Sequence, residues 1–527
     1  MNRLEPDSRY PIDLSSLPES WEAVWVGDAS VGIRPGFASG KHNRNCDGIP
    51  HFRPMNIDRL GMIDLSNVKY VKPENPLRLS SGDVLFNNTN SPDLVGKTAP
   101  ILDGSEVAYS NHMTRVRPAD GISFRFMAHQ LQYLWMTGYF KYRCVKHVNQ
   151  ASISSSTLSS TVPFLVAPSP EQSRIVAEIE KQFSRLDAGV AALRRVEANL
   201  KRYKASVLKA ACTGRLTADW RAAHPDVEPA PKLLQRILTE RRRRWEQIEH
   251  DRTVARGKLP KNDNWKKRYK EPVAFDPDIP RGRLPENWQW VTLGTLAPDV
   301  RDGPHHSPKY ADNGVPFITG GHIRPEGVDF SKTKFISTKL HEEFCLRCKP
   351  EKGDMLYTKG GTTGIAKVNT VEREFSVWVH VAVLKLVSSI SALYLQHALN
   401  SPVCYWQSQN YTHGVGNQDL GLTRMIKIAV PLPPIDEQEE IVTEIDRQMS
   451  LLNEIHLLVD HNLKRAGRLR QSILKDAFEG KLVEQDPADE PASVLLERIR
   501  AERAKASQTD GKAPRRRRKT VIKGKRK

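Results

Sequence analysis

The sequence predicts an α+β protein in which two mixed α/β globular domains are separated by two long helices, with an internal pseudo-two-fold repeat. The 49 residues 168–216 recur without insertion at 434–482, 266 positions later, with 17 identities. Both copies carry a helical pattern of apolar residues, and the regions before them have a composition typical of strands and turns. A repeat of this length, interrupted by a whole domain, indicates one chain that imitates a two-fold dimer.

The repeated segments are predicted to be long helices. Their apolar residues recur at steps of three and four and then of seven, and no proline interrupts about forty residues. This heptad pattern is typical of a coiled coil, with helices on the order of 60 Å long. Packing of each helix on its own domain is the alternative, but two matched stripes favour the coiled coil. The predicted seam, which the resemblance below also makes the docking surface, is Ile179, Leu186, Leu193, Leu200 and Val207 with Ile445, Leu452, Val459, Ala466 and Ile473.

Prolines and glycines mark the ends of these helices. Pro168 and Pro434 precede the two starts, and Gly214 and Gly480 follow the two ends. After each helix the repeat continues as a short helix beginning Glu-Pro-Ala. The predicted divisions are domains at 1–165 and 276–430, helical spacers at 166–216 and 431–482, a short helix and linker at 217–275, a short helix at 483–510 and a basic disordered tail at 511–527.

The charge of the chain predicts a polyanionic partner. Eighty Lys and Arg against 61 Asp and Glu give a formal net charge of +19. Ten of these basic residues lie in 512–527, so the body carries +9. A basic tail typically adds nonspecific affinity, and the interpretation therefore rests on the body.

Several classes of protein are excluded or disfavoured. The sequence has no apolar signal segment at its start and no membrane span, since the most apolar run, Val377 to Val387, predicts a buried strand. Six scattered cysteines fit a reducing cytoplasm. Cys345 and Cys348 have metal-ligand spacing, but no second pair follows, so no metal site is expected. Phosphate-binding loops and nucleophile motifs are missing, and the Gly360–Gly364 cluster is interpreted as a recognition loop or a turn.

The two globular regions share landmarks more than sequence. Leu17-Pro-Glu-Ser-Trp21 corresponds to Leu284-Pro-Glu-Asn-Trp288, and Gly82-Asp corresponds to Gly353-Asp. The spacing between landmarks drifts from 266 to 271 residues. This predicts one fold with two different binding surfaces. His112 and His380 stand at equivalent positions and are predicted to be structural or to contact a nucleic-acid backbone.

With these motifs the chain resembles the specificity subunits of type I restriction-modification enzymes. The resemblance is carried by the paired Pro-x-x-Glu-Gln openings at Pro168 and Pro434 and by the Leu-Lys-x-Ala-x-x-Gly-x-Leu helix ends. It implies two target recognition domains, each reading one half of a split DNA target. The helices, packed antiparallel, would fix the spacer between the half-sites and dock two modification subunits and the restriction subunits. The chain itself would be non-catalytic, with S-adenosylmethionine, ATP and Mg²⁺ on the partner subunits.

Two other interpretations remain open from the sequence. One is a stand-alone DNA-binding regulator or architectural protein, and the other is a coiled-coil scaffold that binds RNA or acidic proteins. Base reading needs Arg, Lys, Asn or Gln on exposed loops, although simple solvent exposure also explains such residues. The candidate DNA-binding residues are Lys41, His42, Asn43, Arg44, Arg53, Asn87, Asn88, Lys97, His305, His306, Lys309, His322, Arg324, Lys359, Lys367, His413 and Asn417.

Overall fold

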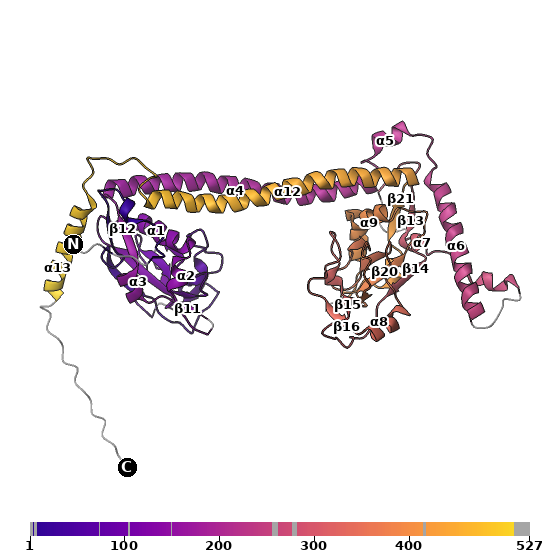
Figure 1. The fold of residues 1–527 in the computed structure, drawn as a ribbon, viewed down its shortest axis with the longest axis horizontal. Coiled ribbons are helices and arrows are strands. Elements are labelled where there is room, and N and C mark those ends of the chain that lie inside the picture. The colour runs from indigo at the N-terminus through magenta and orange to yellow at the C-terminus, as the bar shows by residue number, and fades with distance from the viewer. Residues whose placement is uncertain are drawn as a thin grey trace, which may run out of the picture. The chain divides into compact units, whose positions relative to one another are not determined.

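The computed structural model describes residues 4, 8–72, 74–103, 106–148, 150–255, 262–276, 282–414 and 418–510, so Asn417 and the predicted basic tail lie outside the described residues. The chain folds into two compact units (Figure 1). Unit 1 comprises residues up to Leu193 and from Asp460 onward, and unit 2 comprises residues 194–459. No helix in the described part of the chain is long and apolar enough to cross a membrane.

Unit 1 contains an antiparallel sheet of order β2-β9-β5-β7 and a sheet of order β4-β3-β8, in which β3 and β8 run parallel. β1 pairs with β12, and β10-β11-β6 form a small sheet. Helix α1 packs across β5 and β7 over an apolar core. The elements are η1 Leu14–Ser16, β1 Glu22–Trp25, β2 Ser30–Pro35, β3 Ile49–Phe52, η2 Pro54–Asn56, β4 Lys69–Val71, β5 Val84–Asn87, β6 Thr89–Asn90, β7 Thr98–Pro100, β8 Ala108–Tyr109, β9 Met113–Pro118, α1 Phe124–Met136, α2 Tyr139–Arg143, β10 Val145–Lys146, β11 Ala151–Ser152, α3 Ser155–Thr161 and β12 Pro163–Val166.

Unit 2 repeats the strand order and the pairing directions of three of these sheets. Its sheets are β14-β20-β17-β18, β16-β15-β19 with β15 and β19 parallel, and the pair β13-β21. The apolar run Val377 to Val387, which was predicted to be one strand, contains the last residue of β19 and all of β20, with a turn between the two strands. The elements are β13 Gln289–Thr292, α7 Leu293–Leu296, β14 Asp299–Asp302, β15 Val315–Ile318, η4 Gly320–His322, β16 Lys334–Ile336, α8 Thr338–Cys345, β17 Met355–Thr358, β18 Ala366–Val368, β19 Ser376–Val377, β20 Val381–Lys385, α9 Ala392–Asn400, α10 Pro402–Asn410, α11 Leu422–Met425 and β21 Ala429–Leu432.

The two long helices match the predicted repeat in position and length. Helix α4 spans Ser169–Cys212 and α12 spans Ile435–Phe478, each with 44 residues, or about 66 Å if straight. The first half of α4 and the second half of α12 share the core of unit 1, and the other halves share the core of unit 2. Of the predicted seam, Leu186, Leu193 and Leu200 are half-buried and the other seven residues are buried.

In unit 1, the Pro-x-x-Glu-Gln motif joins α4 to the domain before it. The indole Nε1 of Trp21 donates to Glu171 Oε2 at 3.0 Å, and Gln485 Nε2 donates to Glu171 Oε1 at 2.6 Å. Gln172 Oε1 accepts the backbone N–H of Ser123, which caps α1, at 2.8 Å. Both motif side chains are buried, so their polar atoms must be satisfied by the domain.

The same motif in unit 2 makes an ionic version of this joint. Glu437 is fully buried and accepts from Trp288 Nε1 at 2.8 Å and from the Thr217 hydroxyl at 2.7 Å. Arg221 adds an ion pair, with its terminal nitrogen 2.7 Å from Glu437 Oε1. Gln438 Oε1 accepts the backbone N–H of Ser391 at 3.0 Å, as its counterpart does in unit 1.

The glycine after each long helix approaches the Leu-Pro-x-x-Trp landmark of the opposite repeat. Gly480 and Gly214 both have φ of +70°, the left-handed conformation that ends a helix. A Cβ on Gly480 would lie 2.4 Å from Pro18, and a Cβ on Gly214 would lie 2.4 Å from Pro285. Each landmark therefore contacts the end of one long helix, while its tryptophan binds the start of the other.

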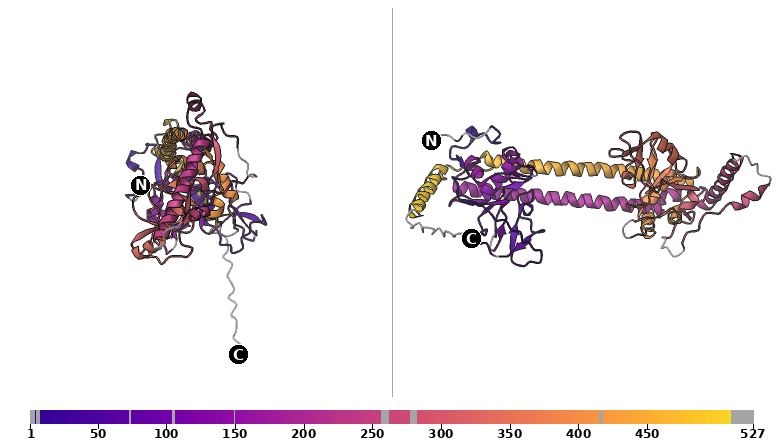
Figure 2. Two further views of the ribbon diagram at one scale, coloured as in Figure 1. Left: turned by 90° about the vertical axis from the view of Figure 1, so that its right-hand side faces the viewer. Right: turned by 90° about the horizontal axis from the view of Figure 1, so that it is seen from below.

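The short helices that follow the long ones also return to the domains. Helix α13, Ala492–Asp510, packs on unit 1, where the N–H of Ala492 donates to Ser20 O at 2.9 Å (Figure 2). Helix α6, Ala230–Ala255, packs on unit 2 through the matching bond from Ala230 to Asn287 O at 2.9 Å. It continues through the arginine run and is therefore longer than the short helix expected. In sequence, α5, Ala218–Ala223, precedes α6, and η3, Asp263–Arg268, follows it.

Removing the Glu437 carboxylate should destabilise unit 2 more than the matching change destabilises unit 1. Glu437→Leu leaves the largely buried Arg221 without its counter-charge, which costs about 3–5 kcal/mol. Glu171→Leu leaves only neutral donors unpaired, at about 1–3 kcal/mol. Hydrogen exchange of peptides from each unit, measured along a urea series, separates the two effects. Equal losses in both units would contradict the ionic account.

Candidate nucleic-acid interface

The predicted basic loops of unit 1 gather at one end of its sheets. The segments after β2, β3 and β5 and the turn between β8 and β9 surround a cavity of about 570 Å³ that is lined by His42, Arg53, Lys97 and His112. A neighbouring cavity of about 700 Å³ shares His42 and is also lined by the predicted residue Lys41. The structure thus brings together residues that are up to 70 positions apart in sequence.

The loop after β2 displays some predicted side chains and uses others internally. Lys41 and Arg44 are exposed. Asn43 is occupied in shaping the loop, because its Nδ2 donates to Asp47 O at 2.7 Å while its Oδ1 accepts the N–H groups of Asn45 and Asp47, both at 3.1 Å. The exposed side chains of Lys41 and Arg44 therefore lie on a loop whose backbone is held by the side-chain amide of Asn43.

A histidine pair lies at the base of this loop. His42 Nε2 is 3.1 Å from His51 Nδ1, and His51 is fully buried on β3. Burial, followed by the charge of His42, lowers the pKa of His51 to about 4. Burial also lowers the pKa of His42, with contributions from Lys69 and Arg53. At neutral pH the pair is consequently uncharged, with one ring donating and the other accepting.

Three residues predicted to be exposed in unit 1 are buried instead. Asn87 Nδ2 donates to Leu94 O at 2.9 Å, and Asn88 Nδ2 donates to Thr114 Oγ1 at 2.8 Å. Lys97 Nζ donates to the carbonyl oxygens of Pro54, at 3.2 Å, and Ile57, and burial lowers its pKa. The expectation that these side chains lie on exposed loops is wrong. Each satisfies backbone or hydroxyl groups that the surrounding loops leave unpaired.

In unit 2 most predicted side chains are accessible. His305, His306, Lys309, Arg324 and His413 are exposed. Arg324 pairs with Asp329 at 2.8 Å. Two half-buried residues, His322 and Lys367, serve their own loops: the His322 ring accepts the N–H of Thr319 at 3.0 Å, and Lys367 Nζ donates to Pro325 O at 3.2 Å.

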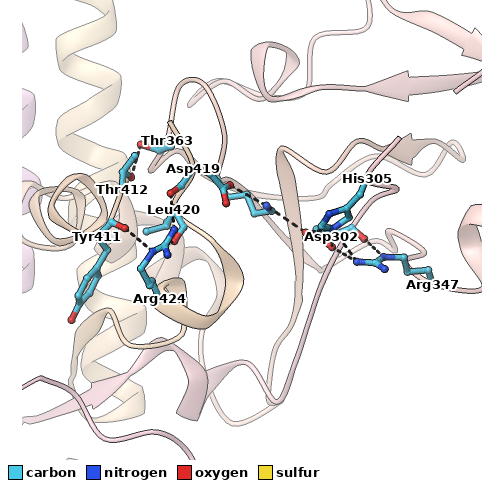
Figure 3. A network of polar contacts seen from close by, with 10 residues as sticks. Asp302, His305, Arg347, Thr363, Tyr411, Thr412, Asp419, Leu420 and Arg424 are labelled. Atoms are coloured by element: carbon cyan, nitrogen blue, oxygen red, sulfur yellow. Dashed lines mark hydrogen bonds and ion pairs between the residues drawn. The ribbon is translucent and has the colours of Figure 1, made fainter. Parts of the chain in front are cut away.

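Lys359 is the predicted residue of unit 2 that the structure buries. Its ammonium lies 3.4 Å from Asp302 and 3.1 Å from Asp419. Asp302, at the end of β14, also binds Arg347 at 2.6 Å and His305 at 3.2 Å (Figure 3). Burial alone would raise the pKa of Asp302, but the hydrogen bond from Arg347 and the charge of Lys359 hold that pKa below its usual value.

This ion network ties the candidate loops of unit 2 to one another. Lys359 O accepts the N–H of Leu420 at 2.7 Å, while Arg424 donates to the carbonyl oxygens of Asp419 and Tyr411, both at 2.9 Å (Figure 3). The segments after β14, after β17 and before α11 are therefore held by one charge cluster that is centred on the buried pair Lys359 and Asp302. Neither Asp302 nor Asp419 was predicted, because their partners lie 45 to 60 residues away in sequence.

The same strand position supports the loops in both units. The N–H of Asn88 donates to His112 O at 3.1 Å, and the N–H of Lys359 donates to His380 O at 2.9 Å. The residue after β5 or β17 is thus paired with the equivalent histidine, while its side chain differs between the units.

The cysteine pair with metal-ligand spacing does not belong to a larger cluster. Cys345 Sγ lies 3.5 Å from His341 Nε2, but no group of three or more His, Cys, Asp or Glu within the described ranges could hold a metal ion.

Acidification should destabilise unit 1 through His51. Its pKa is lowered from 6.5 to about 4, so between these pH values the unfolded chain binds a proton that the folded unit does not. Stability is full above pH 6.5 and falls by about 1–2 kcal/mol from pH 7 to pH 5. Hydrogen exchange of unit 1 at both pH values measures this loss. His51→Leu should reduce the dependence without abolishing it, because burial also lowers the pKa of His129 in the same unit to about 4. His147→Leu, on an exposed residue, should leave the dependence unchanged. An unchanged dependence in His51→Leu would exclude the His51 imidazole as a cause.

The chain is similar to known proteins over almost its whole length. A family model described as the type I restriction modification DNA specificity domain matches residues 285–457. The EcoBI specificity subunit of Escherichia coli is 26% identical over 518 residues, covering 93% of this chain and 94% of the relative. The EcoKI specificity subunit of Escherichia coli strain K12 is 24% identical over 520 residues, covering 94% and 97%.

The fold is also found in a solved structure. A chain from a study of complex assembly and conformational transition of the type I R-M system superposes with a TM-score of 0.56 at 18% identity, covering 90% of this chain and 100% of that one. The alignments to curated relatives run through both units and both long helices. Residues 285–457 thus match a type I restriction modification DNA specificity domain, and the whole chain is similar to type I restriction enzyme specificity subunits.

Proposed function

We propose that this chain is the DNA-recognition subunit of a type I restriction-modification complex and that each unit binds one half of a bipartite target. The observation that carries the proposal is the pair of units that share three sheets of the same strand order and differ in loop chemistry. In unit 1 the candidate loops are held by neutral amides and a buried lysine, and in unit 2 by an ion cluster around the buried Lys359 and Asp302. Two copies of one scaffold with different surfaces are what reading two different half-sites requires.

The long helices are proposed to act as an antiparallel spacer. In unit 1, Asp187 of α4 pairs with Arg470 of α12, and in unit 2, Tyr203 of α4 donates to Gln448 of α12 at 3.3 Å. The residue number of the contact increases along α4 while it decreases along α12, which supports an antiparallel arrangement of the two helices. A continuous helix pair of defined length would set the number of unread base pairs between the half-sites.

Partner subunits are proposed to dock on the outer face of this helix pair. The ten predicted seam residues are buried or half-buried and face other parts of the chain. Leu451, Ile455 and Leu458 of α12 instead form an exposed stripe at helical spacing, with 50, 41 and 62% of their surface accessible. An apolar stripe on a charged helix fits a partner helix. The modification and restriction subunits would supply methylation and cleavage, and would bind S-adenosylmethionine, ATP and Mg²⁺.

Replacing the first domain tests the modular function. Exchange of residues 1–165 for the corresponding domain of another specificity subunit should change one half of the methylated target, because unit 2 keeps its own loops. Sequencing of methylated adenines in a host that carries the partner subunits gives the result. The exchange of 276–430 is the matched control and should change only the other half. A change of both halves in either chimera would contradict independent reading.

The exposed cations of the first loop should contribute to DNA affinity without supporting the fold. Lys41→Ala with Arg44→Ala is expected to weaken binding and to lower the slope of log K against log salt by about 2, since two phosphate contacts are lost. Fluorescence anisotropy over a salt series measures this slope. Lys209→Ala with Arg215→Ala, on exposed residues at the end of α4, is the charge-matched control. An equal effect of both pairs would assign the loss to net charge.

A further inference from the structure

Exposed apolar side chains gather on the loop that follows β3 in unit 1. Met55, Leu60, Met62 and Leu65 have 49, 47, 55 and 67% of their surface accessible. Single exposed apolar residues are common on protein surfaces, but four on one short loop mark a contact site. The corresponding loop of unit 2, residues 319–333, is fully described and has no large apolar side chain that is exposed.

The loop is internally braced, so its apolar tip is held in place. The Asp58 carboxylate accepts the N–H groups of Leu60 and Met62, both at 2.8 Å, and the N–H of Asp58 donates to Met62 O at 3.0 Å. Ile57 and Ile63 pair across the loop and pack on the core beneath it. The turn therefore directs its inner residues into the core and leaves the tip outside.

Buried polar residues anchor this loop to the rest of unit 1. Asn56 Nδ2 donates to Asp64 O at 2.9 Å, and Lys97 Nζ donates to Pro54 O at 3.2 Å. Gln132 of α1 donates to Arg59 O at 3.0 Å. A loop fixed by three buried donors loses little conformational entropy on binding, which is the property required of a rigid probe.

The loop is continuous with the candidate DNA interface. Met55 lines the same cavity as His42, Arg53 and Lys97. Arg59 is exposed beside the tip residue Leu60. Apolar side chains flanked by cations have the chemistry of DNA wedges, in which Leu or Met enters a base step while basic groups neutralise the adjacent phosphates.

We propose that Leu60 and Met62 form a wedge that inserts between stacked base pairs of the DNA bound by unit 1. This inference rests on the proposed function of unit 1 as a half-site reader. Pyrimidine–purine steps open more easily than others, so a wedge selects such steps without hydrogen bonds to bases. Unit 2 would read its half-site without a wedge.

The test uses the full chain assembled with its partner subunits and a duplex carrying the target mapped by adenine methylation. 2-Aminopurine is placed in turn at each step of each half-site. Wild type should raise the fluorescence at one step of the first half-site and at none of the second. Leu60→Ser with Met62→Ser should abolish the rise and weaken binding about tenfold, which corresponds to one opened step losing its wedge.

Val31→Ser is the matched control, because Val31 is 60% exposed on β2 at the end of the strand away from the candidate loops. It should keep both the fluorescence change and the affinity. Target binding by wild type with no fluorescence change at any step would overturn the wedge and leave half-site reading intact. Failure of wild type to prefer its mapped target would instead overturn the proposed function. Loss of subunit assembly without DNA in the double variant would show that the loop binds protein, which also overturns the wedge.

Discussion

A buried carboxylate in the first turn of each long helix determines how the globular domains attach to the helices. Glu171 and Glu437 lie where the helix dipole favours negative charge, and each accepts the indole N–H of the domain's landmark tryptophan. Because the acceptors are buried, any rotation of the domain would leave a charged group without partners. The orientation of the loops relative to the helix start follows from this constraint. The two joints differ in charge, since Arg221 compensates Glu437 and a neutral Gln485 serves Glu171.

Each unit is completed by segments that are remote in sequence. The first domain binds the start of α4, the end of α12 and then α13. The second domain binds the start of α12, the end of α4 and then α6. The glycine-to-proline contacts at Gly480 and Gly214 show why the repeat extends beyond the heptads: a side chain there would collide with the partner landmark. The constant offset between the two copies is therefore required by these contacts as well as by the need to keep the two helices equal in length and in phase.

The loops combine rigid supports with accessible side chains. Lys97 and Lys359 show that a cation beside a binding surface can be wholly occupied in holding it, through carbonyl oxygens in one unit and carboxylates in the other. Lys41 and Lys309, on other candidate loops of the two units, are exposed. Desolvating a lysine is costly unless its donors are satisfied, so a buried one indicates a loop that must not move. Preorganised loops of this kind favour specificity, because a mismatched partner cannot be accommodated by rearrangement.

The sequence by itself determined the two long helices, their equal length, the positions of the domains' landmarks and the resemblance to specificity subunits. These follow from periodicity and from residues at fixed offsets, which are local properties of the chain. Only the tertiary structure decided which loop residues are available to DNA. Asn88, Lys97 and Lys359 are of residue types that can read bases, but they are buried. The apolar residues Leu60 and Met62, in contrast, are exposed at the tip of a braced loop. The physical reason is that exposure depends on partners such as Asp302, 57 residues from Lys359, and no local pattern specifies contacts across that separation.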